Sequence, residues 1–318
     1  MDALPAPMAD WLDMLGTQRR YSAHTLAGYR RDLLLLCGTL GETPLEQVVE
    51  GHVRQAVARL HAAGHHPRSL ARMLSAWRGF YAWWAPRTGL AVNPAQGVRA
   101  PKAGRALPKA LSVDQTQSLL DRSGLPAPAS AVEWRDQAMF EVLYSSGLRL
   151  AELVSLDLRY TRGPGHESQS WIDLETGEAI VRGKGGKTRG VPLGRKAAEA
   201  LREWLRHRPG LERSPAREDD AAALFLGIRG KRISPRVVQK QLASLAARAG
   251  LPVHVHPHSL RHSFASHLLQ SAQDLRAVQE LLGHANISTT QIYTRLDFQH
   301  LAQVYDKAHP RANRKREP

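Results

Sequence analysis

Cysteine is almost absent from this sequence of 318 residues, which contains only Cys37. A single thiol excludes a disulfide framework and a zinc site built on cysteines. Cys37 follows four leucines, so we expect it to pack in a core rather than to act as a nucleophile. Apolar runs fall well short of the ~18 residues that a membrane span needs, and the chain does not open on a signal peptide. These absences predict a cytoplasmic protein without a membrane segment.

Acidic residues are too few to balance the basic ones, since 29 Asp and Glu stand against 44 Lys and Arg, a formal net charge of +15. Residues 1–108 carry a net charge of +6 and the remainder carries +9, so both halves are cationic. A basic protein of this size attracts polyanions, of which nucleic acid is the commonest. The distribution indicates a protein that holds DNA from two sides, with a generic basic surface as the simpler alternative.

Helix signals dominate residues 1–91, which predicts an all-helical first domain. The expected helices comprise an amphipathic stretch at Met8–Leu15, one capped by Ser22, one beginning at Thr43-Pro44 and one opening at His66-Pro67. We expect the aromatic residues from Trp77 to Trp84 to form its core. Residues 92–108 contain three prolines, two glycines and three basic side chains without periodicity, which predicts an extended basic linker.

Residues 109–310 combine helices with a small sheet and are followed by a basic tail at 311–318. Helices are expected after the capping box at Ser112, over 131–146 up to Gly147, directly after that glycine, over 196–206 and over 235–249. Three β-type runs at 171–174, 179–182 and 189–193 predict a small antiparallel sheet, and Tyr160–Ser170 looks like an insertion before it. The expected fold class is mainly α with a small antiparallel sheet (α+β).

Six side chains suited to phosphate and proton chemistry follow one another along this second domain. Arg149 is expected in the first turn of the helix after Gly147, and Lys184 lies in the glycine-rich turn 183–187. His258 and Arg261 are three residues apart, on one helix face. His284 follows a helix stop, and Tyr293 lies in the first turns of a helix that begins with a capping box.

The segments that carry these side chains resemble the tyrosine recombinase (phage integrase) family. They are Ser146-Gly147-Leu148-Arg149, the turn 183–187, His258-Ser259-Leu260-Arg261-His262, Leu282-Gly283-His284 and Gln291-Ile292-Tyr293. The stretches 293–301 and 308–312 resemble the XerC-type branch of that family, and residues 22–29 resemble its core-binding domain. Together these matches span nearly the whole chain in the family's order.

The resemblance implies a DNA-clamping core-binding domain at 1–91, a catalytic domain at 109–310 and a role for each of the six side chains. Tyr293 would attack DNA and form a 3′-phosphotyrosine bond, while Arg149 and Arg261 hold the non-bridging oxygens. Lys184 would be the general acid, with Lys187 as its rival, and His258 the proton acceptor. His284 would bond a non-bridging oxygen. Neither a metal nor ATP is implied.

The resemblance also implies partners for the chain. The family acts as a tetramer on two DNA sites, and an XerC-type member implies a related XerD-type recombinase, a dif-like chromosomal site and an FtsK-type DNA translocase. The biological role would be the resolution of chromosome dimers before cell division. Residues 297–308 are expected to form a helix that docks on a neighbouring protomer.

Other interpretations stay open at this point. A type IB topoisomerase, a phage or integron-type integrase and a non-catalytic architectural DNA-binding protein share parts of the pattern. The helix after Ser234, with Arg236, Gln239 and Lys240, is a candidate for the DNA major groove, or simply an exposed helix. The histidines between 254 and 267 could suggest zinc, but no carboxylate or cysteine accompanies them at ligand spacing.

Overall fold

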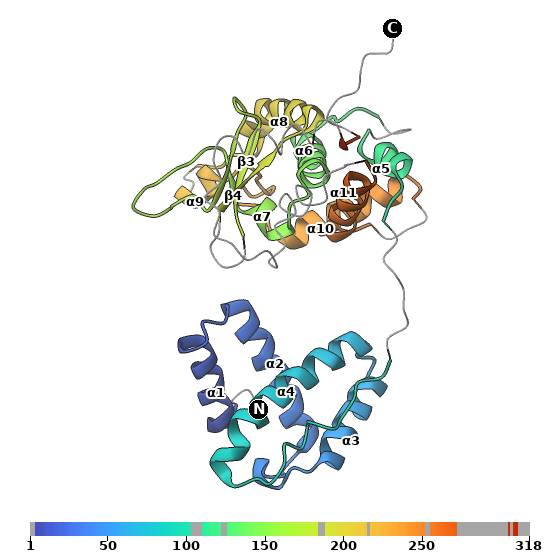
Figure 1. Cartoon of the computed structure of the whole chain (residues 1–318). Helices are drawn as coiled ribbons and strands as arrows, with labels where there is room; N and C mark the ends of the chain where they lie inside the picture. Colours follow the sequence, from blue (N-terminus) through green and yellow to red (C-terminus); the bar gives the residue numbers. More distant parts are fainter. Residues whose placement is uncertain are drawn as a thin grey trace. The chain divides into compact units, whose positions relative to one another are not determined.

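The computed structural model describes residues 4–102, 110–121, 126–183, 188–214, 217–251, 255–271, 305 and 308–310. The chain divides into two compact units, Met1–Leu107 and Pro108–Pro318, each with a hydrophobic core of its own (Figure 1). Most of the described residues are helical and one small sheet lies in the second unit, which confirms the expected fold class. No helix within these ranges is both long and apolar enough to cross a bilayer.

All regular elements described in the first unit are helices: α1 (Ala6–Thr17), α2 (Ala23–Leu40), the 3₁₀ helix η1 (Leu45–Gln47), α3 (Glu50–Ala62) and α4 (Pro67–Thr88). Ser22 caps α2 by accepting the N–H of Thr25 at 3.2 Å. Pro67 opens α4, at a position where its missing N–H breaks no helical bond. Both helices therefore begin where local capping chemistry predicts.

The prediction of a helix that begins at Thr43 is wrong, since only the short η1 forms there and α3 begins at Glu50. Val48 lies between the two, in an extended conformation with φ −70° and ψ 123°. Its side chain is only 2% exposed. Burying this valine in the core takes the chain out of the helical conformation and outweighs the local capping signal.

The core of the first unit forms around the aromatic side chains of α4. Trp77, Phe80 and Tyr81 are fully buried and Trp84 is 5% exposed, which confirms the prediction for these four, whereas Trp83 is only partly buried at the edge of the core. Trp77 Nε1 donates to the carbonyl oxygen of Asp32 in α2 at 2.8 Å. The indole is thus buried without an unsatisfied donor.

Cys37 is half-buried on α2, and its Sγ lies 3.5 Å from the Sδ of Met8 in α1. Burial raises the pKa of the thiol above its ordinary value. Since the thiolate is the reactive form, Cys37 is a poor nucleophile at neutral pH and serves packing.

The beginning of the expected linker packs onto the first unit instead of extending away from it. Ala95 and Val98 are buried in that unit's core. Arg78 of α4 donates to the carbonyl oxygens of both residues, from Nε to Ala95 at 3.0 Å and from Nη2 to Val98. Asn93 Nδ2 in turn donates to the Arg78 carbonyl at 3.0 Å. These long-range bonds leave no periodic trace in the sequence.

The second unit is built around one central helix, α6. Its helices are α5 (Val113–Leu120), α6 (Ala131–Ser146), α7 (Leu150–Val154), α8 (Arg195–His207), the 3₁₀ helix η2 (Arg208–Leu211), α9 (Glu218–Ala222), α10 (Pro235–Arg248) and α11 (Pro257–Ser271). Every residue from Ala138 to Ser146 is buried, and α6 packs against α5, α8, α10 and α11. A helix covered on all faces anchors the elements around it.

The sheet of the second unit contains β1 (Leu156–Asp157), β2 (Ser170–Asp173), β3 (Glu178–Arg182) and β4 (Thr188–Pro192), in that spatial order. β2, β3 and β4 pair antiparallel, as predicted, but β1 pairs parallel to β2. The sheet is therefore mixed rather than purely antiparallel. The segment expected as an insertion before the sheet instead forms the crossover between β1 and β2, because parallel neighbours need a long connection.

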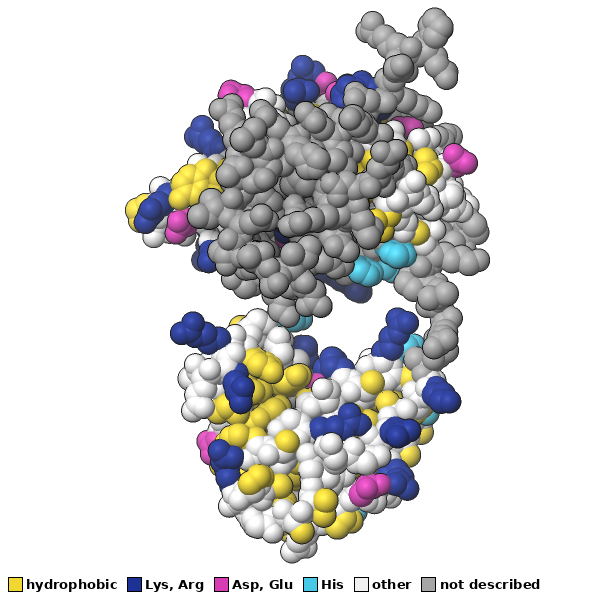
Figure 2. All heavy atoms as spheres, in the orientation of Figure 1, with side chains coloured by type: hydrophobic (Ala, Val, Ile, Leu, Met, Phe, Trp, Pro, Cys, Tyr) yellow, Lys and Arg dark blue, Asp and Glu magenta, His cyan; other side chains and the backbone are white. Residues whose placement is uncertain are grey.

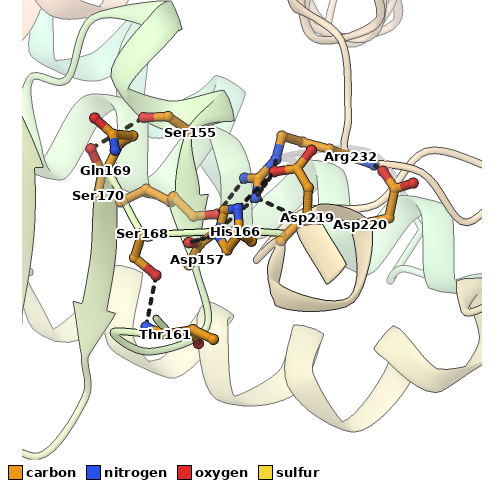
Figure 3. A network of polar contacts seen from close by, with 12 residues as sticks. Ser155, Asp157, Thr161, His166, Ser168, Gln169, Ser170, Asp219, Asp220 and Arg232 are labelled. Carbon is orange, nitrogen blue, oxygen red and sulfur yellow. Dashed lines mark hydrogen bonds and ion pairs between the residues drawn. The ribbon is translucent and has the colours of Figure 1, made fainter. Parts of the chain in front are cut away.

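A polar network holds this crossover against α9 (Figure 3). His166 Nε2 lies 2.7 Å from Asp157 Oδ2, and Arg232 Nη2 lies 2.6 Å from Asp157 Oδ1. The same Arg232 nitrogen lies 2.8 Å from Asp219 Oδ1 in α9. Asp157 is fully buried, so the guanidinium and the imidazole replace the water that its carboxylate has lost.

Candidate functional site

Gly147 sets the geometry of the site, at the point where α6 ends. It adopts the left-handed conformation with φ 57°, as its predicted role at the end of α6 requires. A Cβ atom on Gly147 would lie 2.3 Å from Phe264 Cδ1 of α11. Only glycine therefore allows α6 to turn here and α11 to pack this closely.

The sequence predicts Arg149 in the first turn of α7, but in the structure Arg149 is the N-cap residue that precedes this helix. Its backbone is extended, with φ −72° and ψ 150°, because the turn at Gly147 delays the start of the helix. The backbone N–H of Arg149 donates to Glu152 Oε2 at 2.8 Å, and its Nη1 donates to Glu152 Oε1 at 2.9 Å. The side chain is 40% exposed, so its guanidinium remains accessible to a ligand.

Glu152 lies buried between two arginines. Arg189 of β4 donates to it through both terminal nitrogens, Nη1 to Oε1 at 2.9 Å and Nη2 to Oε2 at 3.0 Å. Burial alone would raise the pKa of Glu152, but the hydrogen bonds and charge of Arg189, together with the hydrogen bonds of Arg149, hold it below its ordinary value. The carboxylate is therefore ionised at neutral pH.

Arg261 enters the same site from α11 and is 9% exposed. Its Nη1 donates to the Gly147 carbonyl oxygen, which joins α11 to the end of α6. Burial, and then the charge of Arg149, lower the pKa of Arg261 to about 10, against the opposing effect of Glu152. Two guanidiniums, those of Arg149 and Arg189, thus bind the Glu152 carboxylate, and the guanidinium of Arg261 binds the chain two residues before Arg149. The excess positive charge suits a phosphate or another anion.

His258 lies one turn before Arg261 on α11, and its side chain is exposed. Its ring is nearly parallel to that of His256, with centroids 6.2 Å apart. His258 and Arg261, predicted to share a helix face, are therefore both on α11. The imidazole of His258 is open to a ligand, whereas the guanidinium of Arg261 is buried.

Three predicted site residues, Lys184, His284 and Tyr293, lie outside the described residues, as does Lys187. The structure does describe the two strands beside Lys184, in which Arg182 of β3 pairs with Thr188 of β4. Residues 183–187, which include Lys184, therefore connect the end of β3 to the start of β4, and Arg189 is the second residue of β4.

His267, from the histidine-rich stretch, is a structural residue. Its Nδ1 bonds the Tyr144 hydroxyl and its Nε2 bonds the Leu111 carbonyl, each at 2.9 Å. Burial lowers its pKa below the ordinary value. Among the described residues, no group of three or more His, Cys, Asp or Glu side chains is arranged to hold a metal ion.

The described residues near the end of the chain pack on their own second unit. Tyr305 and Ala308 are buried, and the Tyr305 hydroxyl lies 2.7 Å from Ser145 Oγ of α6. His309 Nδ1 lies 3.2 Å from the same hydroxyl. Of the segment 297–308, which is expected to form a helix that docks on a neighbouring protomer, only Tyr305 and Ala308 belong to the described residues, and both are buried in their own chain.

The residues proposed for DNA contact, Arg236, Gln239 and Lys240, are all exposed on α10. The opposite face of α10 buries Val238, Leu242, Leu245 and Ala246, so the three polar side chains point away from the core. The first unit likewise presents Lys and Arg side chains over the face shown in Figure 2, where Asp and Glu are sparse. Both units therefore offer basic surface.

Sequence reasoning missed Glu152 and Arg189. Glu152 lies three residues after Arg149, which is the position of a capping-box glutamate. Arg189 occupies an inward position of β4, next to Val191 and Pro192 in the buried pattern of that strand. An arginine at an inward strand position requires a buried acid, and that pairing was the available signal.

Comparison with known families follows the same division of the chain. Residues 109–300 match the Phage integrase family, and residues 8–87 match the domain described as Phage integrase, N-terminal SAM-like domain. The chain therefore belongs to the phage integrase family.

Curated relatives are similar over nearly the whole chain. Tyrosine recombinase XerC 1 of Ralstonia nicotianae is 51% identical over 321 residues, which cover 98% of this chain and 96% of that protein. Tyrosine recombinase XerC of Azotobacter vinelandii is 50% identical over 317 residues and 99% of each chain. The chain is a tyrosine recombinase of the XerC type, an enzyme that cuts and rejoins DNA, as its motifs predict.

Solved structures share the fold. The Tn1549 transposon integrase in complex with circular intermediate DNA has a TM-score of 0.69 at 17% identity, over 92% of this chain and 98% of that one. XerH bound to palindromic difH substrate has a TM-score of 0.64 at 22% identity, over 94% of this chain and 84% of that one.

Proposed function

We propose that this recombinase resolves chromosome dimers at a dif-type site during chromosome segregation and cell division. The single observation that carries the proposed chemistry is that Arg261 binds the carbonyl oxygen of Gly147, two residues before Arg149, whose own guanidinium binds the buried carboxylate of Glu152. Two guanidiniums at one point form an electrophilic site for a phosphodiester, whose charge grows during nucleophilic attack.

In this proposal Tyr293 attacks the scissile phosphate and forms the 3′-phosphotyrosine bond. Arg149 and Arg261 bind the non-bridging oxygens, and His284 adds a hydrogen bond to one of them. His258 accepts the phenolic proton, which its exposure on α11 allows, and Lys184 protonates the leaving 5′ oxygen. The phosphotyrosine bond retains the energy of the broken bond, so neither a metal ion nor ATP is needed.

The proposed partners follow from the same role. The enzyme would act in the cytoplasm on double-stranded DNA, in a heterotetramer with a XerD-type recombinase and under an FtsK-type translocase. The core-binding unit at 1–91 and the catalytic unit at 109–310 would contact the duplex, with residues of the 92–108 segment between them. The exposed residues Arg236, Gln239 and Lys240 support contact through α10.

Trapping on a nicked suicide substrate tests the proposal. Wild-type protein with a dif-type site and a XerD-type partner is expected to form a covalent complex that resists denaturant, and Tyr293→Phe is expected to form none. Covalent attachment of Tyr293→Phe would contradict the nucleophile, and loss of wild-type cleavage in EDTA would favour a metal-dependent reaction. Relaxation of supercoiled DNA without pairing of two sites would favour a type IB topoisomerase.

A further inference from the structure

Arg189 is a buried arginine that the proposed chemistry does not yet use. Its side chain is 8% exposed, on β4 of the sheet. Both terminal nitrogens donate to Glu152, while its Nε is buried and has no hydrogen-bond partner among the described residues. Since desolvating a guanidinium is expensive, a side chain that serves only packing is better replaced by an apolar one.

The contacts of Glu152 show what Arg189 achieves. Oε1 accepts from the terminal nitrogens of Arg149 and Arg189, and Oε2 accepts from the Arg149 backbone N–H and from Arg189. A carboxylate held through both oxygens by a planar fork has a fixed orientation. Because Arg149 is bound to that same carboxylate, its guanidinium has a fixed position as well.

We infer that Arg189 is a positioning residue for DNA cleavage, which acts through Glu152 to hold the Arg149 guanidinium at the scissile phosphate. This inference rests on the proposed function, in which Arg149 binds the phosphate. Arg189 also adds a second positive charge near Arg261, whose pKa it helps to lower. The competing explanation is that Arg189 only steadies the base of the β3–β4 hairpin, on which the proposed general acid Lys184 lies.

Two suicide substrates separate these explanations. They have the same dif-type sequence and differ at the scissile phosphate, where the bridging 5′ atom is oxygen in one and sulfur in the other. In both, Tyr293 Oη forms a bond to phosphorus and the bond to the bridging atom breaks. A thiolate leaves without a proton, because its conjugate acid has a pKa of about 8.5. The sulfur substrate therefore bypasses Lys184 but still needs the arginines.

Arg189→Gln is expected to slow cleavage of both substrates by a similar factor, about 10- to 100-fold, as loss of an orienting partner does in other sites. Arg189→Lys keeps the charge but not the fork, and should slow both substrates to a smaller extent. DNA affinity should change by less than about threefold, since the Coulomb attraction of a single charge among many is small. Lys184→Ala should slow only the oxygen substrate.

Arg206→Gln is the matched control, because Arg206 makes an exposed pair with Glu203 on α8 at 2.7 Å. It should leave both cleavage rates unchanged. Wild-type cleavage rates for Arg189→Gln or Arg189→Lys, with folding checked by circular dichroism, would overturn the inference. It would also fall if Arg189→Gln cleaved the sulfur substrate at the wild-type rate and the oxygen substrate slowly, because the defect would then lie in proton transfer by Lys184. If wild-type protein attached to neither substrate, the proposed function itself would fail.

Discussion

At the scale of single residues, Glu152 determines how much positive charge the site retains. Glu152→Gln preserves the shape of the side chain but leaves the buried Arg189 without a counter-charge. Removing one partner of a buried ion pair costs about 3–5 kcal/mol, so the unfolding free energy should fall by roughly that amount. Urea denaturation measures it, with Glu203→Gln at a half-exposed position of α8 as the control, for which a change below about 0.5 kcal/mol is expected. Equal stability of the two variants would contradict the buried pair.

The pH dependence of this contribution has a defined sign. The pKa of Glu152 is lowered in the folded protein from its ordinary value of 4.5, so ionisation stabilises the fold. The stability difference between wild type and Glu152→Gln should therefore be constant above about pH 4.5 and shrink as the pH falls through the folded pKa. Unfolding free energies at a series of pH values measure it, and a difference that grows on acidification would contradict the assignment.

Gly147 combines a conformational and a steric constraint. Gly147→Ala should lose about 1–2 kcal/mol for the left-handed conformation and about 1–3 kcal/mol more for the clash with Phe264. Gly177→Ala is the matched control, since Gly177 has φ 71° and nothing within 4 Å of an added Cβ. It should lose only the conformational part. Similar melting temperatures for the two variants would show that α11 can shift away from Gly147.

At the scale of elements, the Arg232 network fixes the β1–β2 crossover. Arg232→Gln leaves the buried Asp157 with the imidazole of His166 as its remaining side-chain partner among the described residues and should destabilise the protein by about 3 kcal/mol. Hydrogen exchange should speed up in residues 158–169 more than in α8. Arg229→Gln, at a neighbouring exposed position, is the control and should leave exchange unchanged. Unaltered exchange of the crossover in Arg232→Gln would contradict this role.

The elements that the sequence predicts are those whose signals are local. Ser22, Ser112 and Ser234 each accept an N–H three residues ahead, and their helices begin as expected. β1 has two residues and a partner beyond the crossover, so no periodicity marks it. The predictions of an extended chain at the start of the 92–108 linker and of a helix through Val48 failed for the same reason. Burial against distant residues decided the structure of both segments.

The candidate site shows the same limit. Arg149, His258 and Arg261 could be found because their order along the chain is distinctive, whatever their surroundings. Glu152 and Arg189 carried only weak signals, a capping-box position and an inward strand position, which name no partner. Their importance comes from a contact across 37 positions and from its burial, which only the fold creates.

At the scale of the whole molecule, the net charge of +15 predicts binding that weakens steeply with salt. Each phosphate contact releases condensed counterions, so the logarithm of the affinity should fall linearly with the logarithm of the salt concentration. Lys240→Ala should reduce that slope by about one if α10 contacts the DNA backbone. Lys196→Ala on α8 is the comparison. An identical slope for Lys240→Ala and wild type would exclude a phosphate contact by that side chain.

The half-buried thiol of Cys37 has a practical consequence for spectroscopy. Its raised pKa leaves little thiolate at neutral pH, where maleimide dyes react with the ionised form. A cysteine introduced at the exposed tip of the crossover, such as Arg162→Cys, would thus be coupled to a dye before the native thiol is. One fluorophore per subunit would then report each arrival of the enzyme on a single tethered duplex.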